Sequence, residues 1–248
     1  MNFITEDERK FYWEQGYLII DGFLGASQAG VINQLLRKVA SQDFNIMLHL
    51  DRSEDLLRQS PDSAPADRAK VSSEIRKIQL DQRMVGILEE LYEREMVTVQ
   101  SIIIYKESGK PFADQAWNPH QDNSYVQNPN GMYLAVGYPL LDFSPENGGL
   151  FIYPGSHKDG LYSWEDTEAA NQKYGEGAGN KIVVPDKYEK LDIEMKQGDV
   201  IIFHGDLIHG SYSNHSNQSR PFLVINYIPY GEYFIPGRTS NRKVIRCH

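Results

Sequence analysis

The residues best suited to chemistry in this chain are a histidine and an aspartate in the stretch NPHQDNSY. His120 and Asp122 lie two residues apart near the end of an expected extended segment, so their side chains should point the same way. An imidazole and a carboxylate on one side of a strand are two of the ligands that a transition metal binds. A single H-x-D pattern is common by chance, so a third ligand must come from elsewhere in the chain.

The third ligand is expected in the stretch GDVIIFHGDLIHGS, where an apolar strand runs into two histidines and an aspartate. His204, Asp206 and His209 could form a local site among themselves. Alternatively, His209 alone could join the first two ligands from a neighbouring strand. The second arrangement leaves three positions free on one face of a six-coordinate ion, as in the non-haem Fe(II) oxygenases.

An arginine that follows His209 by eleven residues favours the second arrangement. Arg220 opens the strand RPFLVINY, and a hairpin through SYSNHSNQS would return it to the neighbourhood of His209. A guanidinium on the inward face of a strand is costly unless it meets an anion, and its fork fits a carboxylate in bidentate fashion. That anion is either a bound carboxylate or one of the protein's own acids.

Together these features resemble the phytanoyl-CoA dioxygenase family of Fe(II)/2-oxoglutarate-dependent oxygenases. The resemblance covers about residues 16–227 and includes the intervening stretch PENGGLFIYPGSHKDG. It implies that His120, Asp122 and His209 bind Fe(II), and that Arg220 binds the distal carboxylate of 2-oxoglutarate. It also implies that O2 is consumed, that a C–H bond of a small metabolite is oxidised, and that succinate and CO2 are released.

Several further residues are candidates for the same pocket. Gln100, in VQSIIIYK, matches a position that helps to hold 2-oxoglutarate in ectoine-hydroxylase-like members of the family; alternatively it is a core glutamine bonded to backbone. Asn226 shares a strand face with Arg220 and is a second candidate for cosubstrate binding. The candidates for contacts with the substrate are Trp117, Asn123, Tyr125, His157 and Arg238. For the aromatic residues among them, the alternative is ordinary packing.

Two other functions compete with the oxygenase. Two histidines and a carboxylate also suit the zinc of a hydrolase, although a hydrolase has no need of Arg220 and Gln100 at this spacing. A family member without activity could serve as a binding protein, but none of the expected ligands is missing. Of the remaining histidines, His204 is expected to pack under the metal site and His215 to lie at a polar hairpin tip.

The elements around these residues indicate one mainly β domain with flanking helices, residues 1–248. From residue 96, short runs rich in Val, Ile, Phe and Tyr alternate with Gly, Pro, Asn and Asp: VTVQSIIIY, MYLAVGYPLL, GLFIYP, KIVV, GDVIIF and RPFLVINYI. We expect these runs to form a double-stranded β-helix, the jelly roll of cupin-like proteins, over residues 96–230. Residues 1–95 should be mostly helical wrapping and residues 231–248 a C-terminal tail.

Three helices are expected before the first long strand. The sequence TEDE gives the first one a capping box at Thr5, and Gly16 ends it before a short strand. Ser27 should cap the second helix, and the third should lie just before the first long strand. Residues 49–80 are expected to be a surface excursion or a mobile segment, and residues 157–180 a loop over one end of the sandwich.

The composition of the chain limits the kinds of partner and the cellular compartment that we expect for the protein. The 248 residues carry a net charge of −9, which disfavours nucleic acid and anionic membranes as partners and leaves a small-molecule substrate. The only cysteine, Cys247, excludes a disulfide framework, a cysteine zinc site and a ligated iron–sulfur cluster within one chain. Because no secretory leader or long apolar run is apparent, we expect a cytoplasmic protein. We also expect it to be a monomer or a homodimer.

The last part of the C-terminal tail, residues 237–248, is basic, with Arg238, Arg242, Lys243 and Arg246 and no acid. Such a tail is either a solvated end or one that pairs with its own acidic surface. Alternatively, it folds back over the open end of the sandwich, where its charges could bind an anionic group of the substrate.

Overall fold

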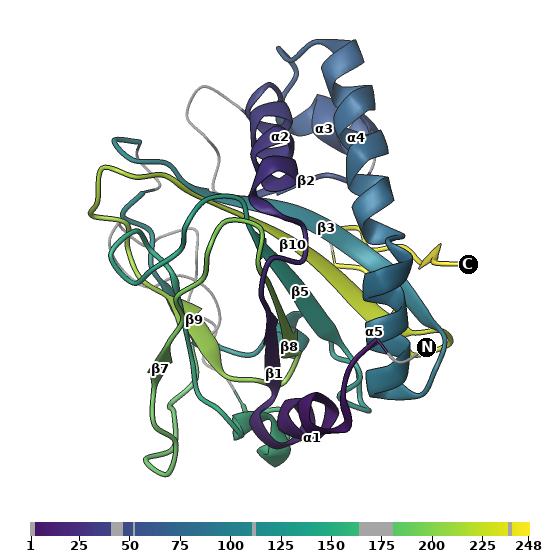
Figure 1. The fold of residues 1–248 in the computed structure, drawn as a ribbon, viewed down its shortest axis with the longest axis vertical. Helices are drawn as coiled ribbons and strands as arrows, with labels where there is room; N and C mark the ends of the chain where they lie inside the picture. The colour runs from purple at the N-terminus through teal and green to yellow at the C-terminus, as the bar shows by residue number, and fades with distance from the viewer. Residues whose placement is uncertain (1–2, 41–46, 52, 111–112, 164–180, 238–239) are drawn as a thin grey trace.

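The computed structural model contains two antiparallel sheets packed face to face, with helices on the outer side of the larger sheet (Figure 1). The expected mainly β jelly roll with flanking helices is therefore confirmed. The residues described are 3–40, 47–51, 53–110, 113–163, 181–237 and 240–248.

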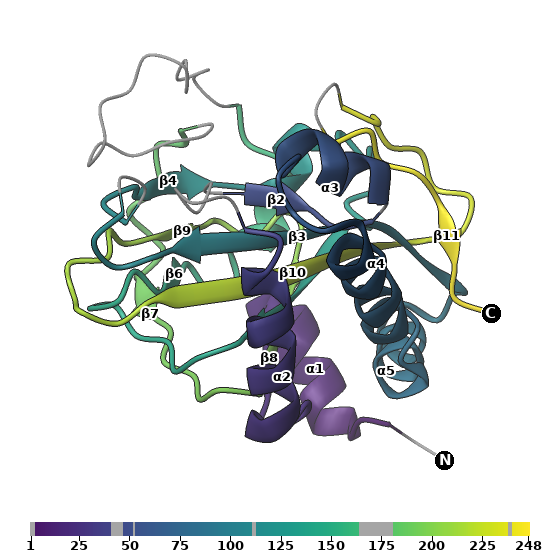
Figure 2. The same cartoon turned by 90° about the horizontal axis from the view of Figure 1, so that it is seen from above.

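The larger sheet has seven strands with β10 near its centre. Its order is β1 (Tyr17–Ile20), β8 (Val200–His204), β5 (Leu134–Pro139), β10 (Arg220–Pro229), β3 (Met96–Lys106) and β11 (Ile245–Arg246), with β2 (Met47–His49) also paired to β3. The smaller sheet has the order β4 (Trp117–His120), β9 (His209–Ser211), β6 (Leu150–Ile152) and β7 (Leu191–Asp192). Seen from above, the smaller sheet lies on one side of the molecule and the helices α3, α4 and α5 on the other (Figure 2).

Two apolar layers hold these parts together. Between the two sheets lie side chains such as Ile102, Phe203 and Phe222, contributed by alternate positions of the strands. On the outer side of the larger sheet, Tyr105 and Leu223 belong to the cluster that also contains the buried helix residues. The inner face of the larger sheet therefore looks toward the smaller sheet, and the site is built between them.

The helices are α1 (Glu6–Gln15), α2 (Ala26–Arg37), α3 (Ser53–Gln59), α4 (Pro65–Gln79) and α5 (Gln82–Tyr92), and two 3₁₀ turns are η1 (Asp122–Tyr125) and η2 (Ser156–Asp159). The capping box at Thr5 is confirmed, and Gly16 ends α1 with a φ of 84°, which favours glycine. In the described part of the chain, no helix is long and apolar enough to cross a membrane.

Three expectations for local structure were wrong. Ser27 lies inside α2, whose N-cap is Gly25. The stretch 49–80 contains α3 and α4; α4 begins with a proline at its first turn and buries Val71, Ile75 and Ile78 at helical spacing, a stripe that the many charged neighbours obscure.

The third wrong expectation is the strand KIVV, where only Lys181 forms a bridge. Of the expected loop 157–180, the first residues form the 3₁₀ turn η2, and residues 164–180 lie outside the described residues.

Candidate metal and cosubstrate site

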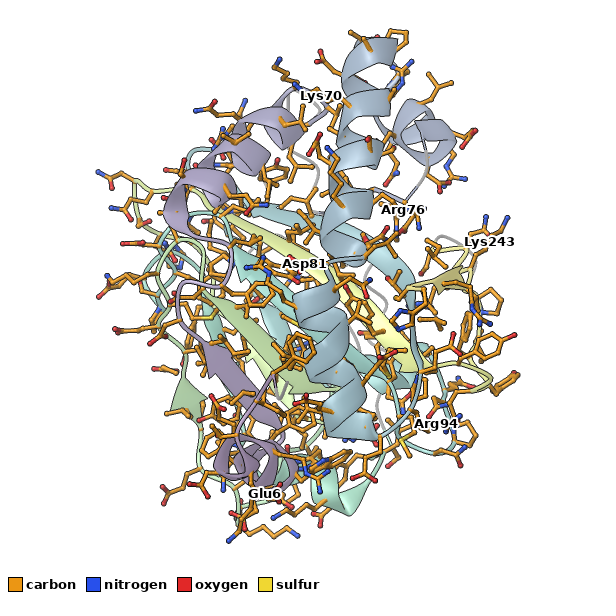
Figure 3. The ribbon with its side chains drawn as sticks, turned by 45° about the vertical axis from the view of Figure 1, so that its right-hand side comes forward. Glu6, Lys70, Arg76, Asp81, Arg94 and Lys243 are labelled. Carbon is orange, nitrogen blue, oxygen red and sulfur yellow. The ribbon has the colours of Figure 1, made fainter. Side chains whose placement is uncertain are left out.

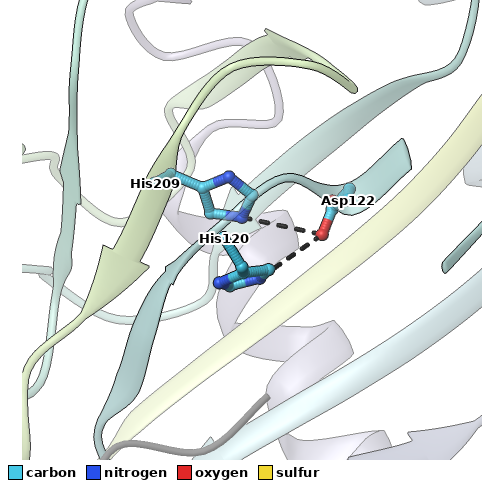
Figure 4. Close-up of side chains that lie close together, drawn as sticks. All are labelled: His120, Asp122 and His209. Carbon is cyan, nitrogen blue, oxygen red and sulfur yellow. Dashed lines mark ion pairs between the residues drawn. The ribbon is translucent and has the colours of Figure 1, made fainter. Parts of the chain in front are cut away.

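The two sequence segments expected to bind a metal meet in the smaller sheet. His120 ends β4 and pairs with His209 at the start of β9, and their ring centroids are 4.4 Å apart. Asp122 was expected to continue the extended segment, but it opens η1, and this turn swings its carboxylate toward both rings. Asp122 Oδ1 lies 3.6 Å from Nε2 of each histidine, and the three side chains point toward one another (Figure 4).

The orientation of both imidazoles suits metal binding. Nδ1 of His120 lies 2.7 Å from the Asn118 carbonyl oxygen, and Nδ1 of His209 lies 3.0 Å from that of Leu207. Each Nδ1–H therefore donates to backbone, which leaves the lone pair of Nε2 free on the side of Asp122. One potential ligand atom from each residue lies within 4.8 Å of the others, close to what an ion with bonds of about 2.1 Å needs.

The electrostatics of His209 and Asp122 favour the protonation states that a cation requires. Burial, reinforced by the neighbouring His120, lowers the pKa of His209 to about 4, so this ring is neutral at neutral pH. For Asp122, burial opposes ionisation, but the histidines and Arg242 outweigh it and lower the pKa of the carboxyl group. The residues present thus fit a divalent metal ion bound by two imidazoles and a carboxylate.

The alternative local site is not formed. The His204 ring packs against His157 at 5.0 Å, and its Nδ1 accepts a hydrogen bond from the backbone N–H of Asp206. The Asp206 carboxylate in turn accepts a hydrogen bond of 2.8 Å from Asn123 Nδ2. Within the described ranges, His120, Asp122 and His209 form the only such cluster of three.

Arg220 lies on the inner face of β10, as expected, but the connection that precedes it was wrongly predicted. β9 belongs to the smaller sheet and β10 to the larger, so the segment between them is an arch from sheet to sheet and not a hairpin. The guanidinium is 2% exposed, lies over the rings of Phe143 and Phe222, and its Nε has no hydrogen-bond partner in the described chain. Among the described residues no acid pairs with it, which leaves a bound carboxylate as the anion that it suits.

A lysine that the sequence analysis did not single out lies beside Arg220. Lys106 is directly opposite Arg220 in the pairing of β3 with β10 and is fully buried. Its Nζ donates to Ser211 Oγ at 2.8 Å and to the carbonyl oxygen of Tyr212. Burial, and then the charge of Arg220, lower its pKa well below the usual value. A lone lysine at the end of the apolar run IIIYK was the available signal.

Lys106 and Arg220 lie close to the three predicted metal ligands. His209 and Ser211 share the inner face of β9 and are about 7 Å apart along the strand. Since Lys106 contacts Ser211, the pair lies at a distance that a short dicarboxylate can bridge while its other end reaches the three metal ligands.

The other predicted pocket residues divide into two groups. Gln100 and Asn226 pair across β3 and β10 on the same inner face, and Gln100 accepts a hydrogen bond from Arg242 Nε at 2.7 Å. The rings of Trp117 and Tyr125 lie 6.1 and 6.0 Å from that of His120. Trp117 and Tyr125 therefore lie beside His120, whereas Gln100 is six residues along β3 from Lys106 and away from the end where Arg220 lies, which does not fit its predicted role in cosubstrate binding.

The remaining predicted residues are held elsewhere. Asn123 forms hydrogen bonds with Asn128 and Asp206, and His157 Nε2 lies 3.1 Å from the carbonyl oxygen of Trp13. Arg238 lies outside the described residues. His215 is largely exposed, as expected for a loop tip.

Comparison with known proteins agrees with this geometry. A family model described as "Phytanoyl-CoA dioxygenase (PhyH)" matches residues 12–222 of the chain. The chain belongs to the phytanoyl-CoA dioxygenase family. It is thus a member of a family of non-haem iron oxygenases that use 2-oxoglutarate.

Two relatives and one solved structure are similar to this chain. The Arabidopsis thaliana phytanoyl-CoA dioxygenase is 28% identical over 88% of this chain and 86% of its own length. A probable α-ketoglutarate-dependent hypophosphite dioxygenase of Stutzerimonas stutzeri is 26% identical over 89% of this chain and 77% of its own. The epimerase SnoN, solved with Fe³⁺, α-ketoglutarate and nogalamycin RO, has the same fold, with a TM-score of 0.69 at 18% identity over 95% of this chain and 86% of its own.

Proposed function

We propose that this protein uses Fe(II), O2 and 2-oxoglutarate to oxidise a C–H bond of a small molecule, releasing succinate and CO2. In this proposal His120, Asp122 and His209 hold the iron, and Arg220 binds the distal carboxylate of 2-oxoglutarate. One observation carries it: a buried guanidinium without an acid partner faces the same interior as a two-histidine, one-carboxylate cluster. A metal site alone fits many enzymes, whereas this combination fits a metal together with a carboxylate cosubstrate.

Each side chain has a defined task. The backbone carbonyls of Asn118 and Leu207 fix the two imidazoles with Nε2 toward Asp122. Arg220 and Lys106 bind and orient one end of the cosubstrate, with Ser211 Oγ between Lys106 and the metal ligands. The apolar side chains between the two sheets exclude water from this interior. The bound iron supplies the activation of O2, which no amino-acid side chain provides.

The family does not specify the substrate. By their names, the relatives act on phytanoyl-CoA or on hypophosphite, and SnoN was solved with nogalamycin RO. The reaction is therefore either hydroxylation or another oxidation of a C–H bond.

Release of succinate tests the proposal. Purified protein reconstituted with Fe(II) should convert 2-oxoglutarate to succinate slowly without substrate, and faster when a small-molecule substrate is added. The rate should vanish without O2, without Fe(II), or when Asp122 is replaced by Ala. Succinate formation at the same rate in the Asp122→Ala protein would contradict the proposed metal site.

The zinc hydrolase is disfavoured by the same observation. Hydrolysis at a zinc ion needs an open coordination position and a water molecule, and no buried cationic pair beside it. If Zn²⁺ supported hydrolysis while Fe(II) with 2-oxoglutarate gave no succinate, the hydrolase would replace the oxygenase.

A further inference from the structure

Another buried cation lies at the opposite end of the same interior from Arg220 and Lys106. Arg242 belongs to the C-terminal tail and is 8% exposed. The turn that precedes it is closed by hydrogen bonds from Asn241 N to Gly237 O (3.1 Å) and from Arg242 N to Pro236 O (2.9 Å). Its neighbour Lys243 is exposed at the edge of the molecule (Figure 3). The tail therefore turns Arg242 inward.

The contacts of Arg242 are all with neutral groups. Nε donates to Gln100 Oε1 at 2.7 Å, and Nη1 donates to the carbonyl oxygens of Tyr125 (3.3 Å) and Ile235 (3.2 Å). Throughout the part of the chain that is described, no carboxylate lies within ion-pair distance of this guanidinium. Asp122 is near enough to interact with its charge, but no described carboxylate contacts the guanidinium, so its donors suit an anion that comes from outside.

Arg242 is close to the metal ligands. Its charge contributes to the lowered pKa of Asp122, and it bonds the backbone of Tyr125, three residues after Asp122 in the same turn. The Tyr125 ring lies 6.0 Å from that of His120. The guanidinium is thus next to the site and not on a distant surface.

The two cationic ends are well separated. On the inner face of β3, Lys106 and Gln100 are six residues apart, about 20 Å along the strand, with Ile104 and Ile102 between them. Lys106 lies beside Arg220 at one end, and Gln100 bonds Arg242 at the other. The three metal ligands face the interior between these ends, because Ser211 links them to the first end and Tyr125 to the second.

We propose that Arg242 and Gln100 form a subsite for an anionic group, a carboxylate or phosphonate, of the substrate that is oxidised. This proposal rests on the proposed function, because it places the substrate on the side of the metal opposite 2-oxoglutarate. His49 extends the subsite, since its Nδ1 lies 3.4 Å from Gln100 Nε2. The substrate class is then a small acid whose reacting carbon lies between its anionic group and the metal.

The test measures whether an anion binds near the metal. Protein loaded with less than one equivalent of Mn(II) is saturated with N-oxalylglycine, which occupies the place of 2-oxoglutarate. Methylphosphonate is added, and the ³¹P relaxation rate is measured, because Mn(II) accelerates the relaxation of nuclei close to it. The neutral diester dimethyl methylphosphonate is the matched probe without charge.

Four variants decide the outcome. We expect enhanced relaxation with methylphosphonate and little with the diester, and an apparent affinity about tenfold or more weaker in Arg242→Gln, since charge-assisted hydrogen bonds contribute roughly 1.5–3 kcal/mol. Arg242→Lys should retain part of the affinity. Lys243→Gln, the same charge change one residue away on the surface, should bind as the unaltered protein does. His209→Ala should not bind Mn(II) at the site, so it gives the ³¹P relaxation rate caused by Mn(II) in solution.

The possible results separate this inference from the proposed function. If Mn(II) and N-oxalylglycine bind but methylphosphonate gives no enhancement above background, or the same enhancement in the Arg242 and Lys243 variants, the subsite is wrong and the oxygenase stands. If Mn(II) and N-oxalylglycine do not bind, the proposed function fails, and the subsite, which is defined by its place beside the metal, fails with it.

Discussion

Replacing Arg220 by methionine should stabilise the protein in the absence of 2-oxoglutarate while abolishing the binding of 2-oxoglutarate. Burial lowers the pKa of Arg220 from 12.5 to about 9, so holding the charged form inside costs on the order of 5 kcal/mol. The rings of Phe143 and Phe222 offset part of this cost, by about 1 kcal/mol each. Methionine fills a similar volume without a charge and also relieves Lys106, whose pKa Arg220 lowers.

We therefore expect the free energy of unfolding of the metal-free, cosubstrate-free protein to rise by about 1–3 kcal/mol in Arg220→Met. Denaturant unfolding followed by fluorescence measures it, and Arg94→Met, which removes an exposed arginine paired with Glu232, is the control with little expected change. Addition of 2-oxoglutarate with Zn(II) should raise the Tm of the unaltered protein but not that of Arg220→Met. Destabilisation by Arg220→Met would refute this reasoning and make the arginine a structural residue.

Three further predictions concern the metal, the cosubstrate and pH. Asp122→Ala should lose Fe(II) binding in a metal-binding assay while circular dichroism shows a folded protein, whereas Asp206→Ala should keep it; the reverse pattern would reject the assignment of ligands. Arg220→Lys keeps the charge but loses the fork, so steady-state kinetics should show a requirement for 2-oxoglutarate raised about tenfold, and an unchanged requirement would count against a bidentate contact. Burial lowers the pKa of His209 to about 4 and of His204 to about 3, so the unfolded chain binds more protons below pH 6.5. As the pH is lowered from 6 to 4, the free energy of unfolding should then fall by about 2.7 kcal/mol per pH unit, and by about half of that in His204→Gln. Equilibrium unfolding at several pH values measures both slopes. An equal slope in the two proteins would mean that His204 is protonated in the folded state.

The cluster of His120, Asp122 and His209 and the buried position of Arg220 could be predicted because each leaves a local signal in the sequence. His120 and Asp122 are two residues apart, and Arg220 is the one charged residue of the run RPFLVINY, at its first position. Their assembly did not depend on the path of the chain between them, so the wrong expectation of a hairpin before Arg220 left the predicted cluster unaffected.

Other features depend on contacts that the sequence does not show. The bond between Arg242 and Gln100 joins residues 142 positions apart, and the inward direction of Arg242 depends on the hydrogen bonds of Gly237 and Pro236 with Asn241 and Arg242. Asn123 was expected at the substrate pocket because it follows a ligand, yet Asp206 holds its side chain. For predicting which residues face the interior, closeness in sequence to a ligand was therefore less reliable than the strand face on which a residue lies.

Anaerobic titration with Fe(II) followed by 2-oxoglutarate tests the central claim most directly. If His120, Asp122 and His209 hold iron and Arg220 holds the cosubstrate, the protein should bind one Fe(II) and one 2-oxoglutarate, with a visible charge-transfer band that appears only when both are present. The band should be lost in Asp122→Ala and should require much more 2-oxoglutarate in Arg220→Lys. An undiminished band in Asp122→Ala, or no band in the unaltered protein with both ligands present, would contradict the account.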